Sequence, residues 1–101
     1  MPELREYELV YILAPTIADD QLPASIEKVN AMVSARGGEV YETQQTPPWG
    51  KRRLAYPIDR HTDGYYVVNA MRMDPTKADD FEHMLKISDE VIRHMLVRMD
   101  V

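Results

Sequence analysis

The spacing of apolar residues predicts a strand over residues 5–13. One side of this strand would carry only large apolar side chains: Tyr7, Leu9, Tyr11 and Leu13. The other side would carry two acidic and two aliphatic side chains: Glu6, Glu8, Val10 and Ile12. Since half of this second side is charged, we expect the first side to enter the core and the second to face solvent or a partner.

Two further segments repeat apolar residues with the period of an amphipathic helix. The first stripe comprises Leu22, Ile26, Val29 and Val33, and the second comprises Ala78, Phe81 and Leu85. Asp19 or Asp20 can cap the first helix, and Asp20 is favoured because Pro23 then falls in the first turn, where its missing N–H matters least. Gly37 is the expected C-terminal stop. Asp74 and Pro75 are the expected cap and first residue of the second helix.

Strand patterns also cover residues 38–46, 53–58, 65–73 and 91–98. If residues 38–58 form one edge strand, the order of elements is β-α-β-β-α-β. Two βαβ units with right-handed crossovers predict an α+β, ferredoxin-like sandwich, in which a four-stranded antiparallel sheet packs two helices on one face. The first and third strands would be central. The length of 101 residues fits a single domain over residues 1–101.

The edge strand is too long for its neighbour. Residues 38–58 would span about 70 Å if fully extended, whereas residues 65–73 span about 30 Å. Pro47 and Pro48 cannot continue a regular ladder. We therefore expect a bend or bulge at residues 47–50, after which residues 50–58 form an arm at the edge of the sheet.

This arm concentrates positive charge in an acidic chain. Residues 49–60 hold four cations and one aspartate, a net charge of +3, while the whole chain carries −5. The cations Lys51, Arg52 and Arg53 lie between Trp49 and Tyr56, an arrangement suited to RNA phosphates and bases. The same cations also fit a simpler role, protection of an exposed edge strand against aggregation. Apolar arm residues either dock a partner chain or complete the core.

Several function classes find no support in the residues. The chain has no cysteine, its three histidines lack the spacing of metal ligands, and no glycine-rich phosphate loop is present. No nucleophile, base and orienting group can be assigned, so we expect no catalysis, cofactor, metal or small-molecule substrate. No apolar run approaches about 20 residues and no signal peptide is evident, so we expect a cytoplasmic protein without a membrane partner.

Three segments form a set: GKRRLAYPI at residues 50–58, REYE at residues 5–8 and DEVIRHM at residues 89–95. Together they resemble the ribosomal protein S6 family of the bacterial small subunit. The arm sequence GKRRLAYPI is similar to that family's signature of glycine, two basic residues and Leu-Ala-Tyr, ending in isoleucine. Residues 5–8, REYE, resemble its opening, and residues 89–95, DEVIRHM, resemble its closing strand. The resemblance extends over the whole chain and agrees with the predicted order of strands and helices.

The resemblance implies a non-catalytic ribonucleoprotein role in translation. Members bind the central domain of 16S ribosomal RNA as a heterodimer with ribosomal protein S18. Carried over by position, the implied RNA-binding residues are Arg5, Tyr7, Lys51, Arg52, Arg53 and Arg93. The implied partner surface is the arm with the exposed sheet face: Trp49, Leu54, Tyr56, Ile58, Tyr66 and Val68. The residues fit a bacterial ribosome and an organellar one alike.

Two other functions are consistent with the fold alone. Ferredoxin-like sandwiches also occur as small enzymes and ligand-binding domains, which require a polar cleft that the sequence does not indicate. A homo-oligomeric interaction module would use the arm to pair with a second copy of the chain. Sedimentation at micromolar concentration would separate this last alternative from a monomer that awaits a different partner.

Overall fold

The architecture was determined from a computed structural model, which describes residues 4–45, 50–58 and 60–99. Five strands and two α-helices follow one another in the order β1-α1-β2-β3-β4-α2-β5, with a short 3-10 turn before each α-helix. The bounds are β1 Arg5–Leu13, η1 Asp19–Gln21, α1 Leu22–Ala35, β2 Glu39–Gln44, β3 Gly50–Ile58, β4 His61–Met73, η2 Pro75–Lys77, α2 Ala78–Ile87 and β5 Val91–Arg98.

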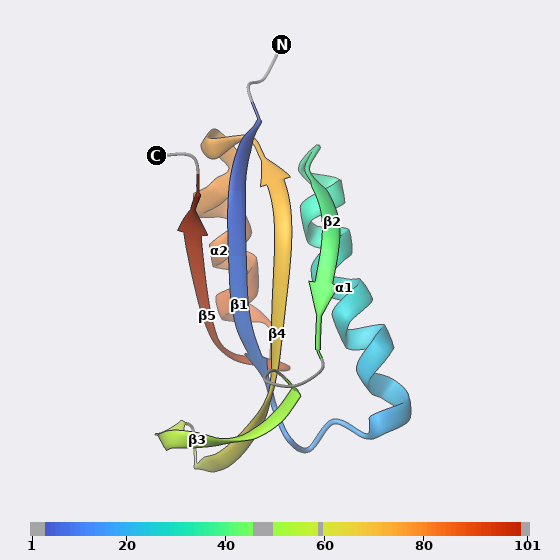
Figure 1. The fold of residues 1–101 in the computed structure, drawn as a ribbon, viewed down its shortest axis with the longest axis vertical. Helices are drawn as coiled ribbons and strands as arrows, with labels where there is room; N and C mark the ends of the chain where they lie inside the picture. The colour runs from blue at the N-terminus through green and yellow to red at the C-terminus, as the bar shows by residue number, and fades with distance from the viewer. Residues whose placement is uncertain (1–3, 46–49, 59, 100–101) are drawn as a thin grey trace.

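All the strands belong to one antiparallel sheet with the order β2-β4-β1-β5, and β3 also pairs with β4. Both helices lie behind this sheet, so one face is covered and the other is open (Figure 1). The predicted α+β ferredoxin-like sandwich is therefore confirmed, as are its central strands, which are β1 and β4. The same α+β architecture places β5 and β2 at the two edges.

The long edge strand differs from the predicted one. Two strands, β2 and β3, share the edge: β2 pairs with residues 68–72 of β4, and β3 pairs with residues 61–66. A register shift between Val40 and Glu42 adds one residue to β2. The bend expected at residues 47–50 falls largely outside the described residues. β4 begins at His61, earlier than predicted, because its first residues pair with β3 to form the arm.

The core lies between the covered sheet face and the helices. The apolar side of β1 is fully buried as predicted, and it packs on the stripes of both helices: Tyr7, Leu9, Tyr11, Leu13, Ile26, Val29, Val33, Phe81 and Leu85. One polar residue, Asn69 on β4, is also fully buried. Its side chain accepts a hydrogen bond from Thr43 Oγ1 at 2.9 Å and donates one to Asn30 Oδ1 at 3.1 Å. This chain of hydrogen bonds ties β2, β4 and α1 together.

The helix ends agree only in part with the sequence pattern. Gly37 has a φ of 74°, which glycine adopts freely, so the predicted stop of α1 is confirmed. Asp74 caps the second helical segment by accepting from the Thr76 backbone N–H, as predicted. The predicted Asp20 cap is wrong, because Gln21 occupies the cap position of α1 without a side-chain bond. The neighbouring Asp19 instead accepts a hydrogen bond from Tyr65 Oη at 2.9 Å.

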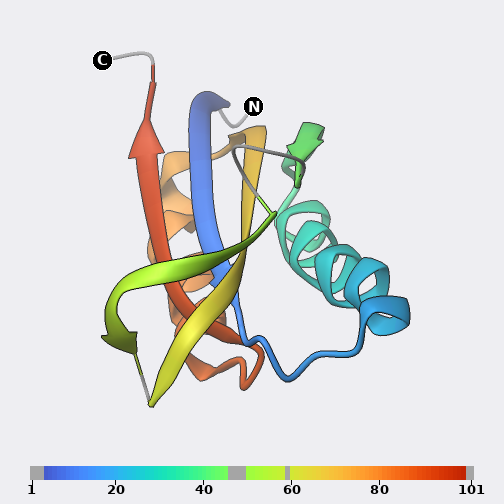
Figure 2. The same ribbon diagram turned by 60° about the horizontal axis from the view of Figure 1, so that its bottom comes forward.

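Residues 61–64 of β4 lie beyond its pairing with β1. The arm, which pairs with residues 61–66 of β4, turns over the open face of the sheet. Figure 2 shows β3 crossing in front of β4 and β1, on the side away from α2. At the crossing point a Cβ atom on residue 64 would lie 2.3 Å from Cγ2 of Ile12 and 3.3 Å from the Leu13 carbonyl oxygen. Only glycine permits this close approach. Leu54 of the arm, 7% exposed, packs beside the same point.

Candidate functional site

The three cations predicted from the sequence are displayed on the arm. Lys51, Arg52 and Arg53 lie on β3 opposite Tyr65, Gly64 and Asp63 of β4. All three side chains are exposed. Among the residues that the structure describes, no carboxylate forms a salt bridge with any of them. Their positive charge is therefore available to an anionic partner.

Tyrosines of β4 lie beneath two of these cations. Lys51 Nζ is 5.6 Å from the centroid of the Tyr65 ring, and Arg52 Cζ is 5.3 Å from that of Tyr66. Such contacts orient a cation without neutralising its charge. The hydroxyl of Tyr65 donates to Asp19, which raises the pKa of that phenol above its usual value. The arm thus combines cations and aromatic rings, as the sequence predicts.

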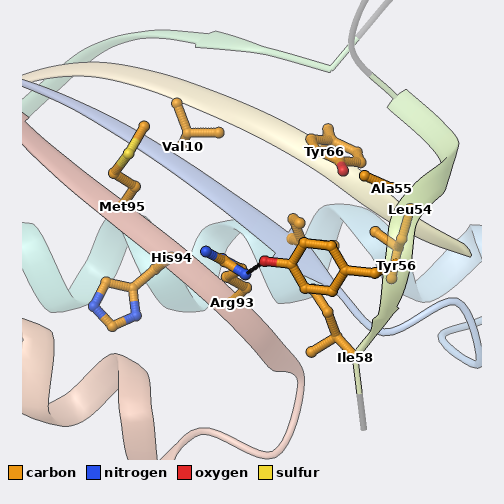
Figure 3. Close-up of a pocket in the computed structure, with 10 residues that line it drawn as sticks. Val10, Leu54, Ala55, Tyr56, Ile58, Tyr66, Arg93, His94 and Met95 are labelled. Atoms are coloured by element: carbon orange, nitrogen blue, oxygen red, sulfur yellow. Dashed lines mark hydrogen bonds between the residues drawn. The ribbon is translucent and has the colours of Figure 1, made fainter. Parts of the chain in front are cut away.

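A groove of about 250 Å³ lies between the arm and the open face of the sheet. Figure 3 shows its lining residues, which come from β1, β3, β4 and β5: Val10, Ile12, Leu54, Ala55, Tyr56, Ile58, Tyr66, Arg93, His94 and Met95. Most of these residues are apolar. Four of the predicted partner-binding residues therefore converge here: Leu54, Tyr56, Ile58 and Tyr66.

One described residue of the predicted partner surface, Val68, is not part of the groove lining. Val68 is buried and lies next to the groove, because it pairs with Val10 across β4 and β1. Trp49 lies outside the described residues. The apolar surface continues along β5, where Met95 and Val97 are exposed. The open face thus offers a wider apolar area than the groove alone.

Arg93 of β5 borders the groove opposite the arm. Its Nη1 atom donates a hydrogen bond to the Tyr56 hydroxyl, and its guanidinium lies 5.6 Å from the centroid of the same ring. Both side chains point across the groove toward each other in Figure 3. Tyr56 is 54% exposed and Arg93 is also exposed, so the contact sits at the surface. The structure thus brings the predicted RNA-binding residue Arg93 close to the arm.

Arg5 and Tyr7 occupy a different place. Tyr7 is 6% exposed and belongs to the core, on the covered face of the sheet. Both residues lie at the start of β1, whereas Arg93 pairs with Ile12 near its end. The structure therefore does not group Arg5 and Tyr7 with the arm cations. Little of the Tyr7 ring is available for a base to stack on.

Two side-chain contacts on the open face have no signal in the sequence pattern. The Tyr56–Arg93 contact joins residues far apart in the chain, and no spacing rule predicts it. A second cluster lies at the opposite end of the open face, where Glu6 accepts hydrogen bonds from Arg72 Nε at 2.7 Å and from the Tyr41 hydroxyl. Glu6 raises the pKa of both partners. This second cluster neutralises its own charge and is not part of the site.

No candidate metal site accompanies the arm and the groove among the described residues. Within them, no group of three or more histidine or acidic side chains is placed to hold a metal ion. His94 is paired with Glu82 at 3.1 Å on the covered side of β5. Over the same residues, no helix has the length and apolarity needed to cross a membrane. What the site presents is a cationic arm beside an apolar groove, suited to a polyanion and an apolar partner surface.

Comparison with known proteins identifies the family. The sequence model described as Ribosomal protein S6 matches residues 6–98. The chain belongs to this family. It is also similar to the crystal structure of 30S ribosomal protein S6 from Thermotoga maritima, with a TM-score of 0.85 and 26% sequence identity. That likeness covers 96% of this chain and 89% of the Thermotoga chain.

Membership in the ribosomal protein S6 family fixes the broad role. The chain is a non-catalytic ribosomal protein of the small subunit, and its partners are ribosomal RNA and ribosomal proteins. The resemblance inferred from the arm signature is confirmed.

Proposed function

We propose that this S6-family protein binds the central domain of 16S ribosomal RNA together with ribosomal protein S18, as a heterodimer that supports assembly of the small subunit in the cytoplasm. Residues 1–101 act as one domain in this role. The observation that carries the proposal is the exposed cluster of Lys51, Arg52 and Arg53, whose charge no described carboxylate neutralises. Phosphate contacts of this kind supply most of the affinity for nucleic acid.

The groove supports the protein half of the proposal. Its lining is mostly apolar and continues into the exposed Met95 and Val97 of β5. Apolar surface of this extent on a small domain is typical of a protein interface. Arg93 at its border would contact RNA phosphates, while Tyr56, Ile58 and Tyr66 would contact S18.

The charge balance explains why two partners are needed. The whole chain carries −5, and residues 74–90 on and around α2 carry −4. An acidic protein is repelled by RNA over most of its surface. A basic partner such as S18 would supply the phosphate neutralisation that the arm alone lacks.

The proposal is tested by replacing Lys51, Arg52 and Arg53 together with alanine. We expect binding of the S18 heterodimer to a central-domain RNA fragment to weaken about tenfold or more, because three phosphate contacts are lost. The free energy of unfolding should change by less than about 1.5 kcal/mol, as for surface substitutions. RNA affinity is measured by gel shift and stability by urea denaturation.

A matched control carries the same change in net charge elsewhere. Lys28, Lys77 and Lys86 are exposed on the helical side, away from the arm. Their triple alanine variant should retain nearly all RNA affinity. Equal losses in the two variants would show that only net charge matters, and a large loss of stability in the arm variant would make the cluster structural.

A further inference from the structure

Among the described residues, the middle of the arm has no paired residue in the ladder with β4. In the ladder between β3 and β4, residues 50–53 pair with residues 63–66, and Ile58 pairs with His61. Residues 54–57 fall in the register shift between these two parts. Backbone pairing to β4 therefore does not fix this segment, although it forms one wall of the groove.

Two side chains tie the unpaired segment to the sheet. Leu54 packs beside Gly64, which anchors the near end of the segment over β1. Tyr56 reaches across the groove to Arg93, on the opposite edge strand β5. Among the described residues, the Tyr56–Arg93 contact is the hydrogen bond that joins the arm to β5.

We propose that Tyr56 is a positioning residue for the S18 interface: its contact with Arg93 holds the arm over the sheet and sets the width of the groove before S18 arrives. The identity of the occupant, S18, rests on the function proposed above. The positioning role itself rests on the geometry of the free protein.

The chemistry of the contact fits positioning. A guanidinium has five N–H donors, and the Tyr56 hydroxyl accepts from one nitrogen, so donors remain for a phosphate. The hydroxyl is neutral and leaves the positive charge of Arg93 uncompensated. A carboxylate in its place would hold the arm equally well but would cancel that charge. Prior ordering of the arm also lowers the entropy that binding must otherwise overcome.

The first test uses the free protein. Tyr56→Phe keeps the ring over Arg93 but removes the hydroxyl, and Tyr41→Phe is the matched control because it removes another exposed hydroxyl near an arginine. We expect backbone heteronuclear NOE values to fall over residues 54–56 and at Ile58 in Tyr56→Phe only, since Pro57 has no amide proton. Both variants should unfold at the wild-type urea concentration, since neither side chain belongs to the core.

The second test measures S18 affinity by calorimetry. Tyr56→Phe should bind about three- to tenfold more weakly than wild type, the range expected for the loss of one ordinary hydrogen bond, because exposure weakens a bond to a charged group. Tyr41→Phe should bind as wild type does. In Tyr56→Phe/Arg93→Gln, the loss should be no larger than in Arg93→Gln alone, because both substitutions break one contact.

The outcomes separate this inference from the proposed function. If wild-type protein does not bind S18, the proposed function fails, while the NOE values still report on the arm. Unchanged NOE values in Tyr56→Phe overturn the positioning role. So does unchanged S18 affinity, or fully additive losses in the double variant.

Discussion

At the residue scale, two tyrosines of the core differ in what their hydroxyls contact. The Tyr65 hydroxyl donates to Asp19, whereas the fully buried Tyr11 hydroxyl has no hydrogen-bond partner among the described residues. A buried polar group without a partner costs free energy on folding. Burial also raises the pKa of Tyr11 far above its ordinary value of 10.0.

Replacing Tyr11 by phenylalanine should therefore leave stability unchanged or raise it by up to about 1 kcal/mol, because only the unpaired hydroxyl is removed. Tyr65→Phe is the control, and it should lower stability by removing a made hydrogen bond. Urea denaturation at neutral pH measures both. A clear loss of stability in Tyr11→Phe would show that its hydroxyl has a favourable partner.

The raised pKa gives Tyr11→Phe a distinct pH dependence. Because the folded protein holds the Tyr11 proton more tightly than the unfolded chain does, its contribution to stability is full below about pH 10 and is lost as pH rises above that value. The variant should lose less stability than wild type between pH 10 and 12. Tyr65 and Tyr41, whose pKa values are also raised, still titrate in the variant, so part of the alkaline loss should persist.

From the sequence, the burial of single residues could be predicted, but their hydrogen-bond partners could not. Alternation along β1 correctly predicts that Tyr11 is buried, because side-chain direction in a strand follows from position alone. The partners of Tyr56 and Asp19 follow from the path of the chain in three dimensions. Asp19 illustrates this: its place before a helix suggests a cap, but β4 brings Tyr65 within hydrogen-bond reach.

At the element scale, Gly64 decides how the arm crosses the sheet. Gly64→Ala should lower the free energy of unfolding by about 1–3 kcal/mol, because its Cβ would meet Ile12 Cγ2 at 2.3 Å and force the arm or Ile12 to move. Urea denaturation measures the loss. In an Ile12→Ala background the same substitution should cost less, since the opposing atom is gone. An equal cost in both backgrounds would exclude this clash.

The strands and helices were predictable, but the division of the edge strand was not. Periodicity identified both α-helices and the segments that form strands, and the excess length of residues 38–58 correctly indicated an arm. Two separate strands, β2 and β3, could not be read from the pattern because both carry ordinary strand residues. The sequence did not show that β4 begins at His61, because residues 61–64 have the composition of a turn. In the structure these residues are part of a strand because they pair with β3.

At the scale of the whole molecule, the charges are divided between the arm and the helical side. The arm and its flanks carry +3, and residues 74–90 carry −4. The open face and the arm form one surface, and the helices occupy the other (Figure 1). The division arises because the basic segment falls on the edge strand and the acidic segment falls on the second helix, which the fold places on opposite sides of the sheet (Figure 1).

This division predicts how RNA binding depends on salt and on the partner. The protein alone should bind a central-domain RNA fragment poorly, and addition of S18 should produce tight binding. If the arm and Arg93 neutralise three to five phosphates, their share of the slope of log affinity against log salt should be about −2 to −5. Gel-shift titrations across a salt series, with and without S18, measure both quantities.

The arm variant, in which Lys51, Arg52 and Arg53 are replaced by alanine, measures how much the arm contributes to the slope of log affinity against log salt. Its heterodimer should show a slope shallower by about 2 to 3, because three fewer counterions are released. The helical control variant has the same net charge as the arm variant, but it should keep the wild-type slope because its lysines lie away from the RNA. Equal RNA affinity with and without S18 would contradict a heterodimer. An unchanged slope in the arm variant would instead place the RNA on another surface.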